Sequence, residues 1–92
     1  MTLHQLKIWT IVARRQSMTK AADELRIRQP SVTQQVKLLE KEYRLKLYEV
    51  NGRGIELTQA GKLFLKNEKR ILLQVQNFEK SLKGLKRSRR HR

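Results

Sequence analysis

The chain has 92 residues, of which 38% are hydrophobic and 33% are charged, a balance typical of one small globular domain rather than of a disordered segment. Its 22 Lys and Arg residues against eight Asp and Glu residues give a formal net charge of +14, which suits nucleic acid or an anionic membrane surface, although charge alone fits a solvated surface equally well. The absence of cysteine excludes disulfides, thiolate metal sites and thiol nucleophiles.

No P-loop, dinucleotide fingerprint or carboxylate cluster is present, so we expect neither an enzyme nor a cofactor or metal site. The N-terminus opens directly into an amphipathic pattern without a long apolar run. The sequence therefore predicts a cytoplasmic, nucleoid-associated protein with no signal peptide or membrane span.

Two helices are predicted at the start of the chain. In residues 3–15, apolar side chains recur at spacings of three and four and form one buried stripe, which consists of Leu6, Trp9, Val12 and Ala13. Ser17 is a good N-cap for a second helix. The adjacent Ala21 and Ala22 in that helix would let another helix cross at close range, as a helix-turn-helix requires.

A third helix is predicted from about residue 29 to residue 43, with Pro30 in its first turn. Its inner face holds Val32, Val36, Leu39 and Tyr43. At 100° per residue, the opposite face is polar and cationic without an acid; it consists of Pro30, Thr33, Gln34, Lys37 and Lys41. We expect this outer face to contact a nucleic acid.

Two short strands, at residues 45–50 and 55–57, flank a glycine-rich turn at residues 51–54. The turn supplies the positive backbone angles of a tight hairpin. Arg53 is the one cation at its tip, between two glycines. So small a hairpin has to pack against the helices to be stable.

Thr58 is expected to cap a last helix that reaches about residue 84 and is roughly 40 Å long. Apolar residues follow a heptad pattern along it, with Glu68 at one position of that pattern; this α-helical seam consists of Phe64, Ile71, Val75, Phe78, Leu82 and Leu85. Such a helix pairs with its counterpart in a second chain or, alternatively, folds against its own domain. Residues 86–92 are basic and lack apolar periodicity, which predicts a disordered tail, either a basic arm or a linker.

Several fragments, in order and at matching spacing, resemble the N-terminal domain of the LysR-type transcriptional regulators. The resemblance covers about residues 3–73 and is carried by LKIW at 6–9, SMTKAADEL at 17–25, QPSVTQQVKLLE at 29–40, LY at 47–48, RG at 53–54 and LTQAG at 57–61. It implies a mainly α-helical winged helix-turn-helix followed by a linker helix that dimerises antiparallel with its partner. It also implies base contacts from Gln29, Pro30, Thr33 and Gln34, and a minor-groove contact from Arg53.

The chain departs from the family pattern at four places. Arg28 stands where the family usually has serine or threonine, which removes the expected N-cap of the third helix. Gln34 and Val50 each replace a common arginine, and Tyr43-Arg44 replaces leucine-glycine. We expect Gln34 to favour A·T over G·C, because glutamine lacks the cationic fork that pairs with guanine.

The sequence thus predicts a dimeric transcriptional regulator that binds a partly palindromic operator in double-stranded DNA, with Lys37 as a further phosphate or base contact. Three units are expected: a DNA-binding domain at residues 1–57, a dimerisation helix at 58–85 and the basic tail at 86–92. We expect a small-molecule inducer only if an effector domain exists outside this chain. The chain itself is either an excised domain or a naturally short protein. Rival hypotheses are a molybdate-responsive type of winged helix, a coiled-coil protein-interaction module and a binder of structured RNA.

Overall fold

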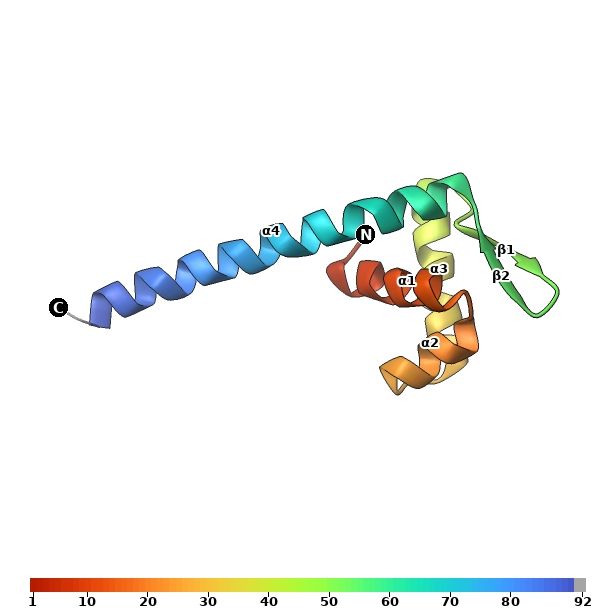
Figure 1. Ribbon diagram of the computed structural model, residues 1–92, viewed down its shortest axis with the longest axis horizontal. Coiled ribbons are helices and arrows are strands. Elements are labelled where there is room, and N and C mark those ends of the chain that lie inside the picture. Colours follow the sequence, from red (N-terminus) through yellow and green to blue (C-terminus); the bar gives the residue numbers. More distant parts are fainter. Residues whose placement is uncertain (91–92) are drawn as a thin grey trace.

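The computed structural model describes residues 1–90, and these form four helices and one two-stranded antiparallel sheet. In chain order the elements are α1 (Leu3–Arg15), α2 (Met18–Leu25), α3 (Gln29–Tyr43), β1 (Tyr48–Asn51), β2 (Gly54–Leu57) and α4 (Gln59–Arg90). The three short helices pack together, while the hairpin and α4 project from them in opposite directions (Figure 1). This is the predicted winged helix-turn-helix with a long last helix.

Hydroxyl groups fix where three of the four helices begin. Thr2 accepts a bond from the Gln5 N–H in a capping box, Ser17 accepts from the Lys20 N–H at 3.1 Å, and Thr58 accepts from the Gly61 N–H at 3.1 Å. Arg28, by contrast, makes no side-chain cap for α3, as the sequence predicted. Helix α3 starts there because Pro30 is preorganised for the first turn.

The core lies where α1, α2 and α3 meet. Trp9 and the inner residues of α3, Val32, Val36 and Leu39, are fully buried, and Ala21 and Ala22 lie beside them. Tyr43 was also expected on this inner face, but it is exposed. The last turn of α3 lies near α4, where the centroid of the Tyr43 ring is 5.8 Å from that of Phe64, and Tyr43 remains 41% exposed.

The first strand of the wing begins at Tyr48 rather than at residue 45, and the second begins one residue earlier than predicted, at Gly54. The Leu47 N–H donates to the Glu40 carboxylate at 2.8 Å, while the Leu47 carbonyl accepts from the Thr58 N–H at 3.1 Å, in register with the neighbouring pair Tyr48–Leu57. Because Glu40 takes the Leu47 N–H, only one of the two backbone bonds of this pair forms, and the regular strand starts at Tyr48.

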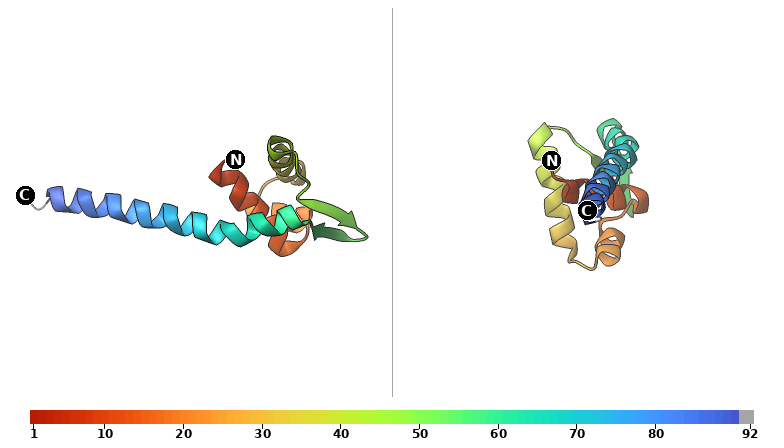
Figure 2. Two further views of the ribbon diagram at one scale, coloured as in Figure 1. Left: turned by 90° about the horizontal axis from the view of Figure 1, so that it is seen from above. Right: turned by 90° about the vertical axis from the view of Figure 1, so that its left-hand side faces the viewer.

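Helix α4 continues to Arg90, past the end near residue 85 that the sequence predicted. Residues 86–90 are therefore helical and not a disordered tail, because lysine and arginine have high helix propensity even where no apolar face remains. Residues 91 and 92 of the predicted tail lie outside the described residues. With 32 residues, α4 is about 48 Å long, and it extends beyond the other helices (Figure 2) to give a molecule of 61 × 26 × 20 Å.

Candidate nucleic-acid interface

The outer face of α3 carries a shallow hollow of about 450 Å³. We call it the α3 hollow; it is lined by Gln29, Pro30, Thr33, Gln34, Lys37, Leu38 and Lys41. Five of the six residues predicted to contact DNA thus lie together on one surface. The sixth, Arg53, lies apart from them on the hairpin.

The opposite side of α3 explains why these side chains face outward. Val32, Val36 and Leu39 are held in the core, and the 3.6-residue period then turns the remaining positions to solvent. The surface is therefore fixed to the rigid part of the fold rather than to a loop.

Two residues of the α3 hollow are already joined to each other. The Gln29 side-chain amide donates to the Thr33 hydroxyl at 2.7 Å, one turn further along the helix. An amide has two N–H donors and one acceptor oxygen, so Gln29 retains one donor and its acceptor for another partner. That pair of groups matches the N7 acceptor and N6 donor of adenine.

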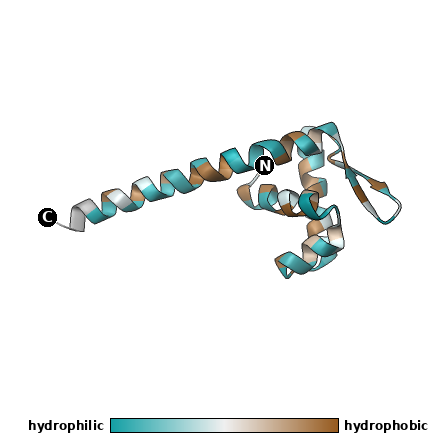
Figure 3. Cartoon of the chain, viewed as in Figure 1, coloured by the Kyte–Doolittle hydropathy of each residue, from teal (hydrophilic) through white to brown (hydrophobic). Residues whose placement is uncertain are grey.

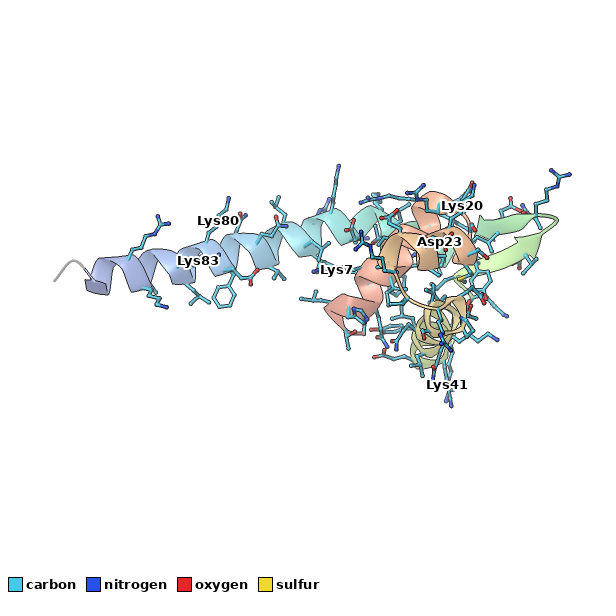
Figure 4. All side chains as sticks on the ribbon, turned by 90° about the horizontal axis from the view of Figure 1, so that it is seen from below. Lys7, Lys20, Asp23, Lys41, Lys80 and Lys83 are labelled. Carbon is cyan, nitrogen blue, oxygen red and sulfur yellow. The ribbon has the colours of Figure 1, made fainter. Side chains whose placement is uncertain are left out.

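The acids of α3 are turned away from the hollow. Glu40 accepts the Leu47 N–H at 2.8 Å, and both carboxylate oxygens of Glu42 bind the amino group of Met1, at 2.6 and 2.7 Å. Lys37 and Lys41 line the hollow without an acidic neighbour among its lining residues, and Lys41 extends away from the domain (Figure 4). The local field favours an anion.

Arg53 lies at the exposed tip of the wing, next to Gly52, whose φ of +52° closes the turn. The base of the wing is fixed, because the Ile55 N–H donates to the Gln16 carbonyl at 3.2 Å. A Cβ on Gly54 would lie 2.8 Å from that same carbonyl, so only glycine permits this approach. Val50, with no predicted role, is 77% exposed.

Some of the predicted dimerisation residues are half-buried in the chain's own fold, and the others are exposed to solvent. Phe64, Ile71 and Val75 are half-buried, and Glu68 at the seam position between them is only 5% exposed. Phe78 is 64% exposed, and Leu82 and Leu85 are exposed too. Figure 3 shows hydrophobic residues recurring along α4 into the part that projects beyond the domain. The first turns of the seam thus pack against the chain's own helices, and the last turns pack against nothing in residues 1–90.

The sequence did not single out Leu38, and it placed Lys41 on the outer face without assigning it a role. Both line the α3 hollow. A leucine in an amphipathic helix is ordinarily counted with the core, so its exposure here could be established only from the packed structure.

Neither tyrosine ionises near neutral pH. Burial raises the pKa of the Tyr48 phenol above its usual 10.0, and the Glu40 charge raises it further. The pKa of Tyr43 is raised in the same way, by partial desolvation first and then by Glu42. Within residues 1–90, no His, Asp or Glu side chains are grouped closely enough to hold a metal ion, and no helix is both long and apolar enough to cross a membrane.

Comparison with known proteins places these features in context. A family model described as bacterial regulatory helix-turn-helix protein, lysR family, matches residues 3–62. The HTH-type transcriptional activator CmpR of Synechocystis sp. is 46% identical over 89 residues, which cover 94% of this chain and 29% of CmpR. The chain thus spans less than a third of the length of that curated relative.

Solved structures show the same arrangement of elements. The CbnR_DBD–DNA complex superposes with a TM-score of 0.87 at 36% identity, over 92% of this chain and 98% of that chain. The BenM_DBD complex with catB site 1 DNA superposes with a TM-score of 0.84 at 33% identity, over 92% and 96% of the two chains.

Proposed function

Because this chain belongs to the LysR family of bacterial regulatory helix-turn-helix proteins, we propose that it binds double-stranded DNA as a dimeric transcriptional regulator. Helix α3 enters the major groove, and Arg53 enters the adjacent minor groove. The observation that carries this proposal is the α3 hollow, in which five residues of suitable chemistry project from a helix anchored in the core.

Affinity and specificity come from different side chains. Lys37 and Lys41 neutralise phosphates and release counterions, which gives affinity without sequence information. Gln29 and Gln34 have the amide geometry to pair with adenine, and Thr33 offers both a hydroxyl and a methyl group. Arg53 in a narrow minor groove reads its shape and negative potential.

The dimer forms through α4. An exposed row of large apolar side chains on a helix that leaves its own domain is what a partner helix covers. An apolar hollow of about 170 Å³ lies beside the half-buried start of the seam, before this exposed row; it is lined by Met1, Leu6, Leu63, Phe64, Asn67 and Ile71. A two-fold dimer of this kind presents two copies of α3 to a partly palindromic operator.

The units of the chain follow from these roles. Residues 1–57 form the DNA-binding domain, and the dimerisation helix starts at residue 58 and includes the basic residues 86–90. We propose a non-enzymatic regulator of the cytoplasm and nucleoid, which responds to a small-molecule inducer only through an effector domain outside this sequence.

Titration of duplex DNA at 50 and 200 mM salt tests the proposal. A dimer that contacts six to ten phosphates should lose about 10³- to 10⁵-fold in affinity over this range, with two chains bound per site. Lys37→Ala removes two phosphate contacts per dimer and should make the slope of log K against log salt shallower by about 2. Lys83→Ala, which removes a lysine from the projecting half of α4 (Figure 4), is the matched control and should leave the slope unchanged.

Two results would contradict the proposal. One is an affinity for duplex DNA that does not change with salt. The other is equal binding of duplex RNA, since the narrow major groove of RNA does not admit a helix.

A further inference from the structure

Leu38 is an apolar side chain in an otherwise polar and cationic surface. It is 44% exposed, and it lines the α3 hollow beside Gln34, Lys37 and Lys41. Leu38 does not belong to the core cluster that holds α3 in place. The neighbouring Leu39 does. The fold therefore gives no packing reason for a leucine here.

Single exposed leucines are common and need no special explanation. Leu73 on α4 is one example, at 57% exposure. The position of Leu38 distinguishes it, because Gln34 lies one turn before it and Lys41 one turn after it on the same side of α3. A protein partner would need a wider apolar patch than this one side chain, which lies between lysines.

The major groove of DNA offers one apolar feature at the base edges, the 5-methyl group of thymine. An isobutyl group makes no hydrogen bond, so it can distinguish base pairs only through this methyl group. Leu38 also lies nine residues after Gln29, which is about 13.5 Å further along the helix axis and about 180° around it. The two side chains therefore border the outer face of α3 on opposite edges, so they do not contact the same base pair.

We propose that Leu38 is a specificity-determining residue that packs against the 5-methyl group of a thymine in each half-site. The inference rests on the proposed function, since it requires α3 to lie in the major groove. Lys37 and Lys41 hold the flanking phosphates, which brings the Leu38 side chain against the groove floor. The operator is then recognised over a longer stretch than the amide side chains alone can read.

The test uses deoxyuridine, which is thymidine without the 5-methyl group. A duplex is first selected from random-sequence DNA with the full chain, and each of its thymines is then replaced singly by deoxyuridine. For the unmodified chain, one replacement per half-site should weaken binding about fourfold, the ratio that a methyl-sized contact of about 0.8 kcal/mol produces. Leu38→Ala should bind the unreplaced thymine duplex about as weakly as the unmodified chain binds the duplex with that one replacement. Replacement of that thymine, and of no other, should leave the affinity of Leu38→Ala unchanged.

Leu73→Ala is the matched control, an equally conservative change of an exposed leucine outside the hollow, and it should keep the full thymine-to-uracil profile. If Leu38→Ala shows the same profile as the unmodified chain, or weakens thymine and uracil duplexes equally, the inference is overturned and Leu38 contacts only the backbone. If the unmodified chain retains no duplex during selection, the proposed function itself fails.

Discussion

At the scale of single residues, the bond between Gln29 and Thr33 links two side chains proposed to read bases. The Thr33 hydroxyl accepts one N–H of the Gln29 amide at 2.7 Å. This bond restrains the amide and leaves its other N–H and its oxygen unused by Thr33. In the proposed complex, Thr33 therefore positions Gln29.

We predict that Thr33→Val lowers the preference for adenine over guanine at the base pair read by Gln29. A bidentate amide–adenine pair is worth about 1–3 kcal/mol of discrimination, and a freely rotating amide should lose part of it. Valine keeps the shape of threonine, so the free energy of unfolding should change by less than about 0.5 kcal/mol. Competition binding with A·T and G·C at that position measures the effect.

Thr33→Ser restores the hydroxyl and should restore the preference. If the valine and serine variants discriminate equally, the hydroxyl does not orient Gln29. A double variant with Gln29→Ala should lose no more discrimination than Gln29→Ala alone, because the two residues act as one unit.

At the scale of elements, the close packing of α4 against α1 and against the chain before the wing depends on Gly61. The Trp9 indole N–H donates to the Gly61 carbonyl at 3.1 Å. A Cβ on Gly61 would lie 2.1 Å from the Leu47 carbonyl oxygen and 2.8 Å from the Trp9 ring. Helix α4 can approach the core this closely only without a side chain here.

We predict that Gly61→Ala lowers the free energy of unfolding by about 3 kcal/mol or more, since backbone must move and a buried hydrogen bond is strained. Gly84→Ala provides the control on the same helix, because a Cβ there meets nothing within 4 Å. It should raise helix content and increase the free energy of unfolding by at most about 1 kcal/mol. Urea unfolding at fixed protein concentration, followed by circular dichroism, measures both.

A gain in the free energy of unfolding for Gly61→Ala equal to that for Gly84→Ala would show that helix propensity at these positions, and not the contact with Leu47 and Trp9, decides stability. A bond to α3 explains why the wing begins late. Glu40 accepts the Leu47 N–H, so the pair of Leu47 with Thr58 keeps only the bond from the Thr58 N–H, and regular pairing starts at Tyr48.

At the scale of the whole molecule, the two ends of helix α4 have different surroundings. Its first turns complete the domain, and its remaining turns expose Phe78, Leu82 and Leu85 to solvent. An amphipathic helix draws most of its stability from the packing of its apolar face and little from its own propensity. In the proposed dimer, a second copy of the chain covers the exposed row and stabilises this part of α4.

We predict that Phe78→Glu raises the dimer dissociation constant at least about a hundredfold, since each buried phenylalanine is worth about 1.5–3 kcal/mol and every 1.4 kcal/mol is tenfold. The domain itself should stay folded, because Phe78 is outside its core. Sedimentation equilibrium measures the dissociation constant.

Leu73→Glu is the control for that experiment. Leu73 is exposed to a similar degree but lies about 180° around the helix from Phe64, so the dimer should persist. Dissociation of both variants to the same extent would mean that the added charge, and not the seam, weakens the dimer.

Local sequence features determined the helix starts, the glycine turn and the outward face of α3, because caps, turn residues and the 3.6-residue period act over a few neighbours. Ser17, Thr58 and Gly52 each have the predicted role, and the five predicted residues of α3 share one surface. Arg44 departs from the family glycine, yet it adopts the left-handed conformation with φ of +54°. The turn after α3 is therefore set by its packing and not by that one residue.

Only the tertiary structure decided the features that depend on distant segments. The bond from the Leu47 N–H to Glu40 shortened the first strand, the position of α4 left Tyr43 exposed, and the core buried Leu39 but left Leu38 on the surface. Helix α4 continues beyond the end of its apolar seam, because helix propensity does not depend on an apolar face. A linear pattern records which side chains are apolar, but which of them are buried depends on what the rest of the chain brings against them.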